Sequence, residues 1–315
     1  MNNNDKEFFD SVWENDSQKE TSSSIEEIDA NEDVKNNNTG YMCNSCRTIF
    51  TTNSIDNCPI CGGKSFVSSN SGLQNNILYI PFNIDLEEAK KEYKKYIRFK
   101  FFIPFMFRKK RVYENLKKVY VPVSLYNCKA SGDVIYYSAD ENVINKKHEI
   151  KKYECEYETN FDYNNVLVSE CSKINEEIFS DIFDYDYSGT SLYQDSILGD
   201  GVIINGDIDS NDLETKLNGK VMKQSLLLVK DEISHHLKKL KENKLTMSIT
   251  SNNKVLVPIF LLTVKYKDKN NYYLMNGQNK KIIFSSELSK VNIALFGLII
   301  FALVFIFAYL LSCII

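Results

Sequence analysis

The sequence lacks most of the motifs from which an enzyme is recognised. Its 315 residues include only three histidines (His148, His235 and His236), and the last two are adjacent in a segment with helical spacing. There is no GxxxxGK[ST] phosphate loop, no GxSxG nucleophile motif and no HExxH zinc motif. We therefore predict that the chain is not an enzyme, and no small-molecule substrate is evident.

The beginning of the sequence lacks an apolar run, and its end lacks charged residues. No apolar run follows Met1, so we expect no secretory signal. No charged residue lies between Val291 and Ile315, and Ile293–Leu311 as a helix would extend about 28 Å, close to the hydrocarbon thickness of a bilayer. Lysines precede this segment and none follows it. We predict a transmembrane helix over residues 291–313 in a single-pass, tail-anchored protein of the cell membrane, with the N-terminal domain cytoplasmic.

Charge is distributed in blocks, although 43% apolar and 25% charged residues are ordinary values that exclude collagen-like and wholly disordered chains. Residues 1–35 carry 11 acidic and 3 basic side chains, and we expect a disordered acidic tail over residues 1–40. Residues 140–215 carry 19 acidic side chains, and an enzyme would have to draw its carboxylates from this block.

Four of the eight cysteines lie close together in two CxxC pairs, Cys43 with Cys46 and Cys58 with Cys61, and Gly62 follows. Four soft thiolates favour tetrahedral Zn²⁺ and leave no coordination position for a substrate, so the site would be structural. Two disulfides would require an oxidising compartment. We predict a zinc ribbon over residues 41–68, and its few basic residues favour a protein-binding or spacer role over nucleic-acid binding.

The patterns over residues 77–288 predict an α+β domain with mostly antiparallel strands. Ile77–Ile80 should form a short strand, and a helix should begin near Asp85, whose pairing with Glu88 has the form of a capping box. Helical spacing recurs over residues 174–183 and 220–241. The dipeptide Asn276-Gly277 predicts a hairpin with a type I′ turn. The expected hydrophobic stripe of the 220–241 helix is Val221, Leu228, Ile233, Leu237 and Leu240.

Two segments repeat each other at a separation of 136 residues. KVYVPVSLYNCKASGDVIYY (Lys118–Tyr137) aligns without gaps on KVLVPIFLLTVKYKDKNNYY (Lys254–Tyr273). Each should be a strand that carries its proline at an edge or a bulge. Chance similarity is one interpretation; the other is a duplicated β element whose copies pair in one sheet.

A basic, aromatic segment, Lys94–Arg111, alternates cations with phenylalanines. It could be a core element with solvated lysines, a surface that binds anionic lipid, or a surface on which single-stranded nucleic acid stacks. The nearby membrane helix favours lipid over nucleic acid. The candidate contact residues for either are Lys94, Lys95, Arg98, Lys100, Arg108, Lys109, Lys110 and Arg111.

One further segment, Asp184–Asp195, has acidic residues at positions 1, 3 and 12 of a calcium loop and glycine at position 6. Ser191 stands where such loops have an apolar residue. We therefore favour an acidic loop without an ion.

The order of these features resembles a family of bacterial membrane proteins of uncharacterised activity, labelled as transcription-factor-IIB-type zinc-ribbon proteins or as primosomal-protein-N′-like. The resemblance covers Cys43 to the C-terminus and depends on CPICG, IPFNIDLEEAKKEYKKYI, VYVPVSLYNCKASG, FDYDYS, VLVPIFLLTVKYK and MNGQNKK. It implies zinc and a membrane location. The helicase label would require ATP hydrolysis, for which this chain lacks the residues.

These observations predict a non-enzymatic, tail-anchored, zinc-binding membrane protein that acts as an adaptor or scaffold. Its expected partners are membrane lipid and an unidentified protein. The alternative is a membrane-attached nucleic-acid-binding protein that uses residues 94–111.

Overall fold

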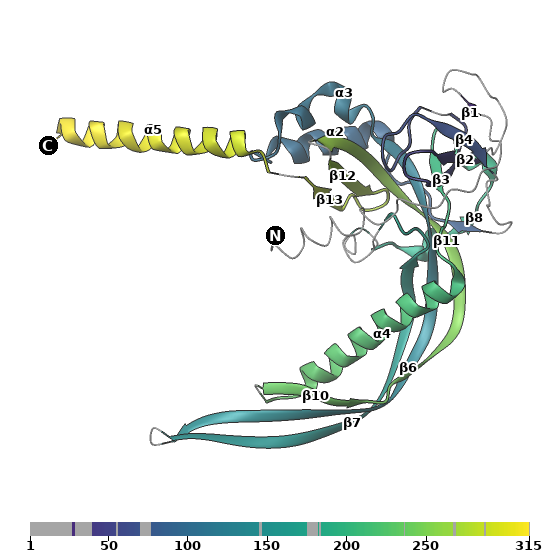
Figure 1. Ribbon diagram of the computed structural model, residues 1–315, viewed down its shortest axis with the longest axis vertical. Helices are drawn as coiled ribbons and strands as arrows, with labels where there is room; N and C mark the ends of the chain where they lie inside the picture. The colour runs from purple at the N-terminus through teal and green to yellow at the C-terminus, as the bar shows by residue number, and fades with distance from the viewer. Residues whose placement is uncertain are drawn as a thin grey trace.

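The computed structural model describes residues 27–28, 40–54, 56–69, 77–144, 147–174, 182, 184–235, 237–266, 269–286 and 288–314. The described residues form one sheet of 13 strands, with helices on its faces and one helix that projects from it (Figure 1). Apart from the two residues of β1 and Gly40, the predicted tail lies outside the described residues, as does most of the predicted helix 174–183.

The elements follow one another in this order: β1 (Glu27–Ile28), β2 (Gly40–Cys43), β3 (Ile49–Thr52), β4 (Phe66–Ser69), β5 (Leu78–Tyr79), α2 (Leu86–Arg98), the 3-10 turn η1 (Phe105–Arg108), α3 (Lys110–Tyr113), β6 (Lys117–Ile144), β7 (Lys147–Ser169), η2 (Tyr187–Gly189), β8 (Ser191–Leu192), η3 (Asp195–Ile197), β9 (Val202–Ile204), α4 (Ser210–Glu232), β10 (Leu237–Asn243), β11 (Thr246–Tyr266), β12 (Lys269–Asn276), β13 (Ile282–Ser285) and α5 (Lys290–Ile314).

The two repeated segments are the centre of the sheet. They lie in β6 and β11, which pair antiparallel, and the register places Val121 directly opposite Val257, its equivalent in the repeat. Val119, Val121 and Val257 are fully buried. The two copies therefore pair with each other in one sheet, as the duplication interpretation requires.

Each copy also has the same kinds of neighbour. β6 pairs in parallel with β9 through Val119 and then antiparallel with β7 from Val123 onward. β11 pairs in parallel with β5 through Val255 and then antiparallel with β12 from Ile259 onward. The repeat is thus the core of a local two-fold arrangement, whose axis passes through the Val121–Val257 pair.

The two prolines of the repeat lie where each strand changes neighbour, and neither lies at a bulge. The register shifts occur elsewhere, between Tyr126 and Cys128 in β6 and between Ile249 and Ser251 in β11. The carbonyl oxygen of Pro122 accepts from the Glu170 amide, and that of Pro258 accepts from the Gly277 amide. In a strand the backbone nitrogen and oxygen of one residue point to the same side. The missing N–H of Pro122 therefore faces the gap between β9 and β7, and that of Pro258 faces the gap between β5 and β12.

Beyond this centre, β6, β7, β10 and β11 continue as a long curved arm, and α4 lies along one face of it (Figure 1). The buried residues of α4 recur at a spacing of four: Leu213, Leu217, Val221, Ser225 and Val229. The predicted helix over 220–241 was wrong in its second half. The helix ends at Glu232, and Leu237 and Leu240 are exposed residues of β10, whose backbone pairs with β6.

Helix α2 begins as predicted, because the Asp85 carboxylate caps it by accepting from the Glu88 amide at 2.7 Å. Its inner face, with Ala89, Tyr93 and Ile97, packs against Phe260 and Tyr273 of the sheet. Tyr93 also donates to the carbonyl of Phe107. This packing holds the basic segment against the body of the molecule.

The predicted hairpin at Asn276-Gly277 is present, because β12 and β13 pair antiparallel from Met275 and Ile282. It does not have a type I′ turn, since Gly277 has a negative φ and Lys280 is the residue with positive φ. Instead, the buried Asn276 side chain accepts from the amides of Gln278 and Asn279 and organises a longer loop.

Helix α5 matches the predicted transmembrane segment. It runs from Lys290 to Ile314, and its stretch up to Phe307 is long and apolar enough to cross a membrane. Only 6% of that stretch is buried within the molecule. Figure 1 shows α5 projecting alone from the body.

Candidate metal centre and membrane-proximal segment

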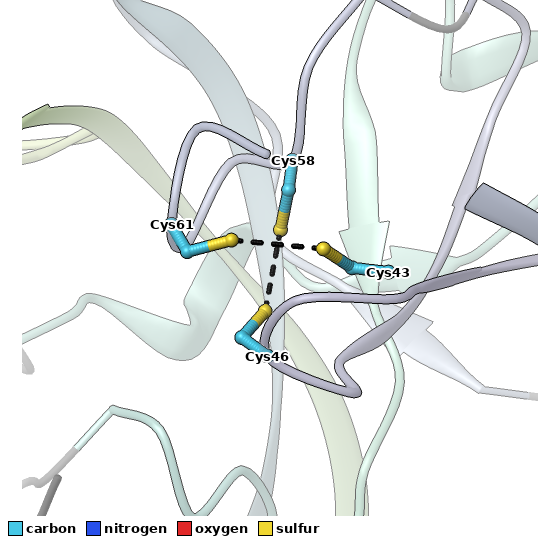
Figure 2. Close-up of side chains that lie close together, drawn as sticks. All are labelled: Cys43, Cys46, Cys58 and Cys61. Carbon is cyan, nitrogen blue, oxygen red and sulfur yellow. Dashed lines mark hydrogen bonds between the residues drawn. The ribbon is translucent and has the colours of Figure 1, made fainter. Parts of the chain in front are cut away.

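The four cysteines of the two CxxC pairs converge on one point from two loops (Figure 2). The first knuckle, Cys43–Cys46, lies at the end of β2, and the second knuckle, Cys58–Cys61, lies between β3 and β4. The sulfur atoms lie within 4.8 Å of one another, with separations of 3.6 Å between Cys43 and Cys61 and between Cys46 and Cys58. These four residues could hold a metal ion.

The two knuckles have the same backbone conformation. In each, the amide that follows the second cysteine donates to the carbonyl of the first: Arg47 to Cys43 at 2.8 Å, and Gly62 to Cys58 at 2.9 Å. Both donor residues have left-handed backbones, with φ of 59° and 73°. Glycine adopts this conformation freely, whereas arginine does so at a cost.

Gly63, the second of two glycines that follow Cys61, lies against the sulfur atoms. Its amide donates to the Cys61 sulfur at 3.4 Å. A Cβ atom at this position would lie 2.9 Å from the Ser45 hydroxyl and 3.3 Å from the Cys43 sulfur. The backbone therefore approaches the cysteine cluster as closely as only glycine allows.

Crowding shifts the pKa values of these thiols in opposite directions. Hydrogen bonds from Cys46, Cys58 and Cys61 hold the pKa of Cys43 well below its ordinary value. Hydrogen bonding with Cys43 is the largest cause that raises the pKa of both Cys58 and Cys61. Four thiolates at these distances would repel one another, so a cation between them is what would allow all four to lose their protons.

The cysteine loops are attached to the central sheet at several points. β3 pairs with β9, so that Phe50 lies opposite Ile204, and this links the cysteine region to β6. The Thr263 hydroxyl donates to the carbonyl of Pro59 at 2.8 Å, and the Lys117 amine donates to that of Asn57 at 2.9 Å. Burial lowers the pKa of this lysine.

The hydrophobic core also crosses from the cysteine loops into the sheet. Cys43, Cys58 and Ile60 belong to the same buried cluster as Val121 and Val257. Because four cysteines fill a tetrahedral coordination shell, this arrangement can bind an ion and brace the fold but offers no position to a reacting substrate. Among the described residues, no other such group of potential metal ligands occurs.

The basic segment forms the C-terminal half of α2, η1 and the start of α3. All eight of the candidate contact residues named from the sequence are exposed. Three of them lie beside aromatic rings: Lys94 is 4.3 Å from the ring centre of Tyr113, Lys100 is 4.7 Å from that of Tyr96, and Arg108 is 5.3 Å from that of Phe105.

The phenylalanines of this segment divide into two groups. Phe107 is buried with Ile103 in the cluster beneath α2, as a core element would be. Four others are exposed, with exposed fractions of 66% for Phe99, 62% for Phe101, 37% for Phe102 and 57% for Phe105. The core interpretation therefore explains only part of the segment.

The exposed part of the segment is bonded to the start of α5. The amide of Ser289 donates to the carbonyl of Phe102 at 2.7 Å, and the Asn292 side chain donates to the carbonyls of Phe101 and Ile103. The rings of Phe102 and Phe296 meet edge to face at 5.2 Å. No sequence pattern marks Ser289 and Asn292, because their partners are backbone atoms of a segment about 190 residues away.

Two other segments on which the resemblance depends also contact each other. The Gln278 side chain accepts from the Asp186 amide at 2.7 Å and donates to the Asp186 carbonyl at 2.9 Å. Asn276 and Asn279 both donate to the carbonyl of Asp184. The loop 276–281 thus clamps the segment 184–186, where the sequence had suggested a calcium loop as one interpretation.

Two of the three acidic groups of that suggested calcium loop, those of Asp184 and Asp186, have protein partners. The Asp184 carboxylate pairs with Lys281, and the Asp186 carboxylate accepts from the amide and the hydroxyl of Ser188. These hydrogen bonds lower the pKa of Asp186. Beside Asp184 lies an open hollow of about 410 Å³ between β7 and α4, and Asp184 is the one carboxylate among its lining residues.

No protein-family model, no curated protein sequence and no solved structure matches this chain. The resemblance to zinc-ribbon membrane proteins therefore stays a prediction from the sequence segments.

Proposed function

We propose that this chain is a non-enzymatic, zinc-binding membrane adaptor, anchored by α5 with its folded part in the cytoplasm. The observation that carries the proposal is the exposure of α5. Most of the apolar side chains that the structure describes in this helix are exposed, with exposed fractions of 64% for Leu298 and 70% for Phe301. Apolar surface of this extent is stable in lipid and costly in water.

Zinc is the metal that we propose for the cysteine site. A tetrahedron with zinc–sulfur bonds of 2.3 Å has sulfur–sulfur edges of about 3.8 Å. The two separations of 3.6 Å between opposite cysteines are close to this value. The expected result is one zinc per chain by elemental mass spectrometry of the purified full-length protein, and a clearly lower content would contradict this part of the proposal.

The cytoplasmic orientation is supported by the lysines at one end of α5. Lys290 begins the helix, Lys280 and Lys281 lie shortly before it, and residues 291–315 contain no basic residue. Reduced cysteine thiolates also suit the cytoplasm. Intact cells treated with protease should leave the folded part uncut, whereas permeabilised cells should lose it; cutting in intact cells would reverse the orientation.

The adaptor role is supported by the face of the arm that α4 leaves open. Along β7 the exposed residues alternate, so that Glu154, Glu156 and Glu158 share this face with Tyr137 of β6. Lys241 of β10 pairs with Glu154 and lies 5.0 Å from the ring centre of Tyr137, which leaves Glu156 and Glu158 to attract basic side chains of a partner protein.

A photoreactive amino acid tests this surface in the cell. Placed at Tyr137, it should give a reproducible protein adduct, which Glu156→Lys with Glu158→Lys should reduce. Placed at Leu228, an exposed residue of α4, it should not give that adduct. Equal labelling from both positions, or none from Tyr137, would count against an adaptor that uses the arm.

A further inference from the structure

The basic segment and α5 form one unit at the base of the helix. Ser289 and Asn292 bond to backbone atoms of residues 101–103, and Phe102 packs against Phe296. Phe296 is six residues beyond Lys290, which corresponds to about 9 Å along the helix axis. Phe102 therefore contacts α5 within its apolar stretch and not merely at its end.

The side chains that surround this junction are of two kinds. Phe99, Phe101 and Phe105 each expose more than half of their surface. The eight basic residues of the segment are exposed, and no carboxylate occurs between residues 94 and 111. The nearest acidic residues are already paired: Glu92 lies 3.9 Å from Lys95, and Glu114 lies 2.8 Å from Lys90.

Aromatic rings beside cations are what the headgroup region of a bilayer accommodates. Phenylalanine rings enter the boundary between headgroups and acyl chains, and lysine and arginine reach the phosphates. The rings of Tyr96 and Phe105 already lie next to Lys100 and Arg108. The same set of side chains can thus contact apolar and anionic groups together.

We propose that residues 94–111 form a collar that docks on the headgroups of anionic phospholipid and fixes how the folded part sits on the membrane. This inference rests on the proposed membrane role of α5. The collar is tied to α5 by hydrogen bonds, so insertion of the helix delivers the collar to the lipid surface. The exposed phenylalanines then enter the interface, and the cations select anionic headgroups.

The test uses the full-length protein in lipid nanodiscs, with photoreactive benzoyl-phenylalanine in place of Phe105. Discs of phosphatidylcholine alone are compared with discs that contain phosphatidylglycerol. The expected result is a lipid adduct by mass spectrometry, in a yield that rises with phosphatidylglycerol. The same probe at Tyr137, an exposed aromatic residue of the arm, should give no lipid adduct.

A charge variant tests selection by the cations. Arg108→Gln, Lys109→Gln, Lys110→Gln and Arg111→Gln together should lower the adduct yield in anionic discs roughly threefold or more and leave it unchanged in neutral discs. Lys238→Gln with Lys239→Gln, on β10, should change neither. Unchanged zinc content and melting temperature show that the variant folds. Hydrogen exchange of residues 94–111 in the wild-type protein gives a second readout, and we expect slower exchange in anionic discs than in neutral ones.

Three results would overturn the collar: lipid adducts of equal yield at Phe105 and Tyr137, a yield that depends on neither phosphatidylglycerol nor the four charges, or an adduct with added single-stranded DNA in place of lipid. A failure of the anchor is distinguishable from these. If the protein leaves the discs in high salt, the proposed membrane role fails; if it stays and Phe105 gives no lipid adduct, only the collar fails.

Discussion

At the scale of single residues, the clearest difference between equivalent positions is that between Arg47 and Gly62. Both follow the second cysteine of a knuckle, both donate to the carbonyl of the first, and both have positive φ. A side chain with a Cβ atom costs about 1–2 kcal/mol in this region of backbone space. Arg47 therefore carries a strain that Gly62 does not.

We expect Arg47→Gly to stabilise the folded part and Gly62→Ala to destabilise it, each by about 1 kcal/mol. The reason is that the first substitution removes a Cβ atom from a left-handed backbone and the second adds one. Urea unfolding in detergent micelles measures both. Gly189→Ala is the control, since Gly189 lacks positive φ and a Cβ atom there would meet nothing within 4 Å. Destabilisation by Arg47→Gly would show that the arginine side chain contributes more than its backbone costs.

At the scale of elements, much of the structure is held by loops that bond to distant backbone. The Gln278 side chain pairs with both backbone groups of Asp186, in the way that a neighbouring strand would. The second knuckle similarly receives hydrogen bonds from side chains of β6 and β11, to the carbonyls of Asn57 and Pro59. Such contacts fix which strands meet, and they depend on single side chains.

Gln278→Ala should destabilise the folded part by about 1–2 kcal/mol, because both backbone groups of Asp186 lose a partner. Hydrogen exchange at Asp186, together with urea unfolding, measures the effect. Asn253→Ala, at an exposed position of β11, serves as the control; an equal loss in both variants would contradict the clamp.

Removal of the metal should weaken the pairing of β3 with β9 more than the other strand pairings of the sheet. With Cys58→Ser or a chelator, zinc should be lost and hydrogen exchange of Val202–Ile204 in β9 should accelerate, because β3 carries part of the cysteine region and pairs with β9. Cys155→Ser, in the arm, should retain the metal. Wild-type zinc content in Cys58→Ser would show that Cys58 is not a ligand.

At the scale of the whole molecule, two projections leave the body: the arm and α5 (Figure 1). The arm covers one of its faces with α4, whereas α5 contacts the body near its start, through Asn292 and Phe296, and only 6% of its apolar stretch is buried. A helix of this kind has to obtain its cover from outside the molecule. The proposed membrane role therefore rests on exposure as much as on composition.

A charge in the middle of α5 should release the protein from the membrane. Leu298→Lys adds a cost of about 3 kcal/mol at the bilayer centre, and Leu298→Lys with Ile299→Lys adds more. The variants should move to the soluble fraction after alkaline extraction. Leu237→Lys, an exposed leucine of β10, should remain with the wild type in the membrane fraction; retention of the double variant would contradict an anchor.

The features that could be predicted from the sequence have local causes. The Asp85 cap depends on one hydrogen bond to a residue three positions away, and the cysteine pairs and the apolar helix depend on spacing and composition. The helical spacing over 220–241 failed from Ile233 onward. There β6 offers backbone partners to Leu237–Asn243, and these long-range hydrogen bonds outweigh a local helical preference.

By itself, the sequence determined that four thiols converge, that a helix begins at Asp85, that an uncharged helix follows Lys290 and that two segments are alike. Only the tertiary structure decided that those segments pair through Val121 and Val257, that Asn276 and Gln278 clamp residues 184–186, and that Asn292 ties the basic segment to α5. The physical reason is the separation along the chain between the residues that interact. Capping and metal-ligand spacing involve neighbours in the chain, whereas strand register and the partner of a buried amide are set by residues about 100 to 190 positions away, whose closeness only the folded chain creates.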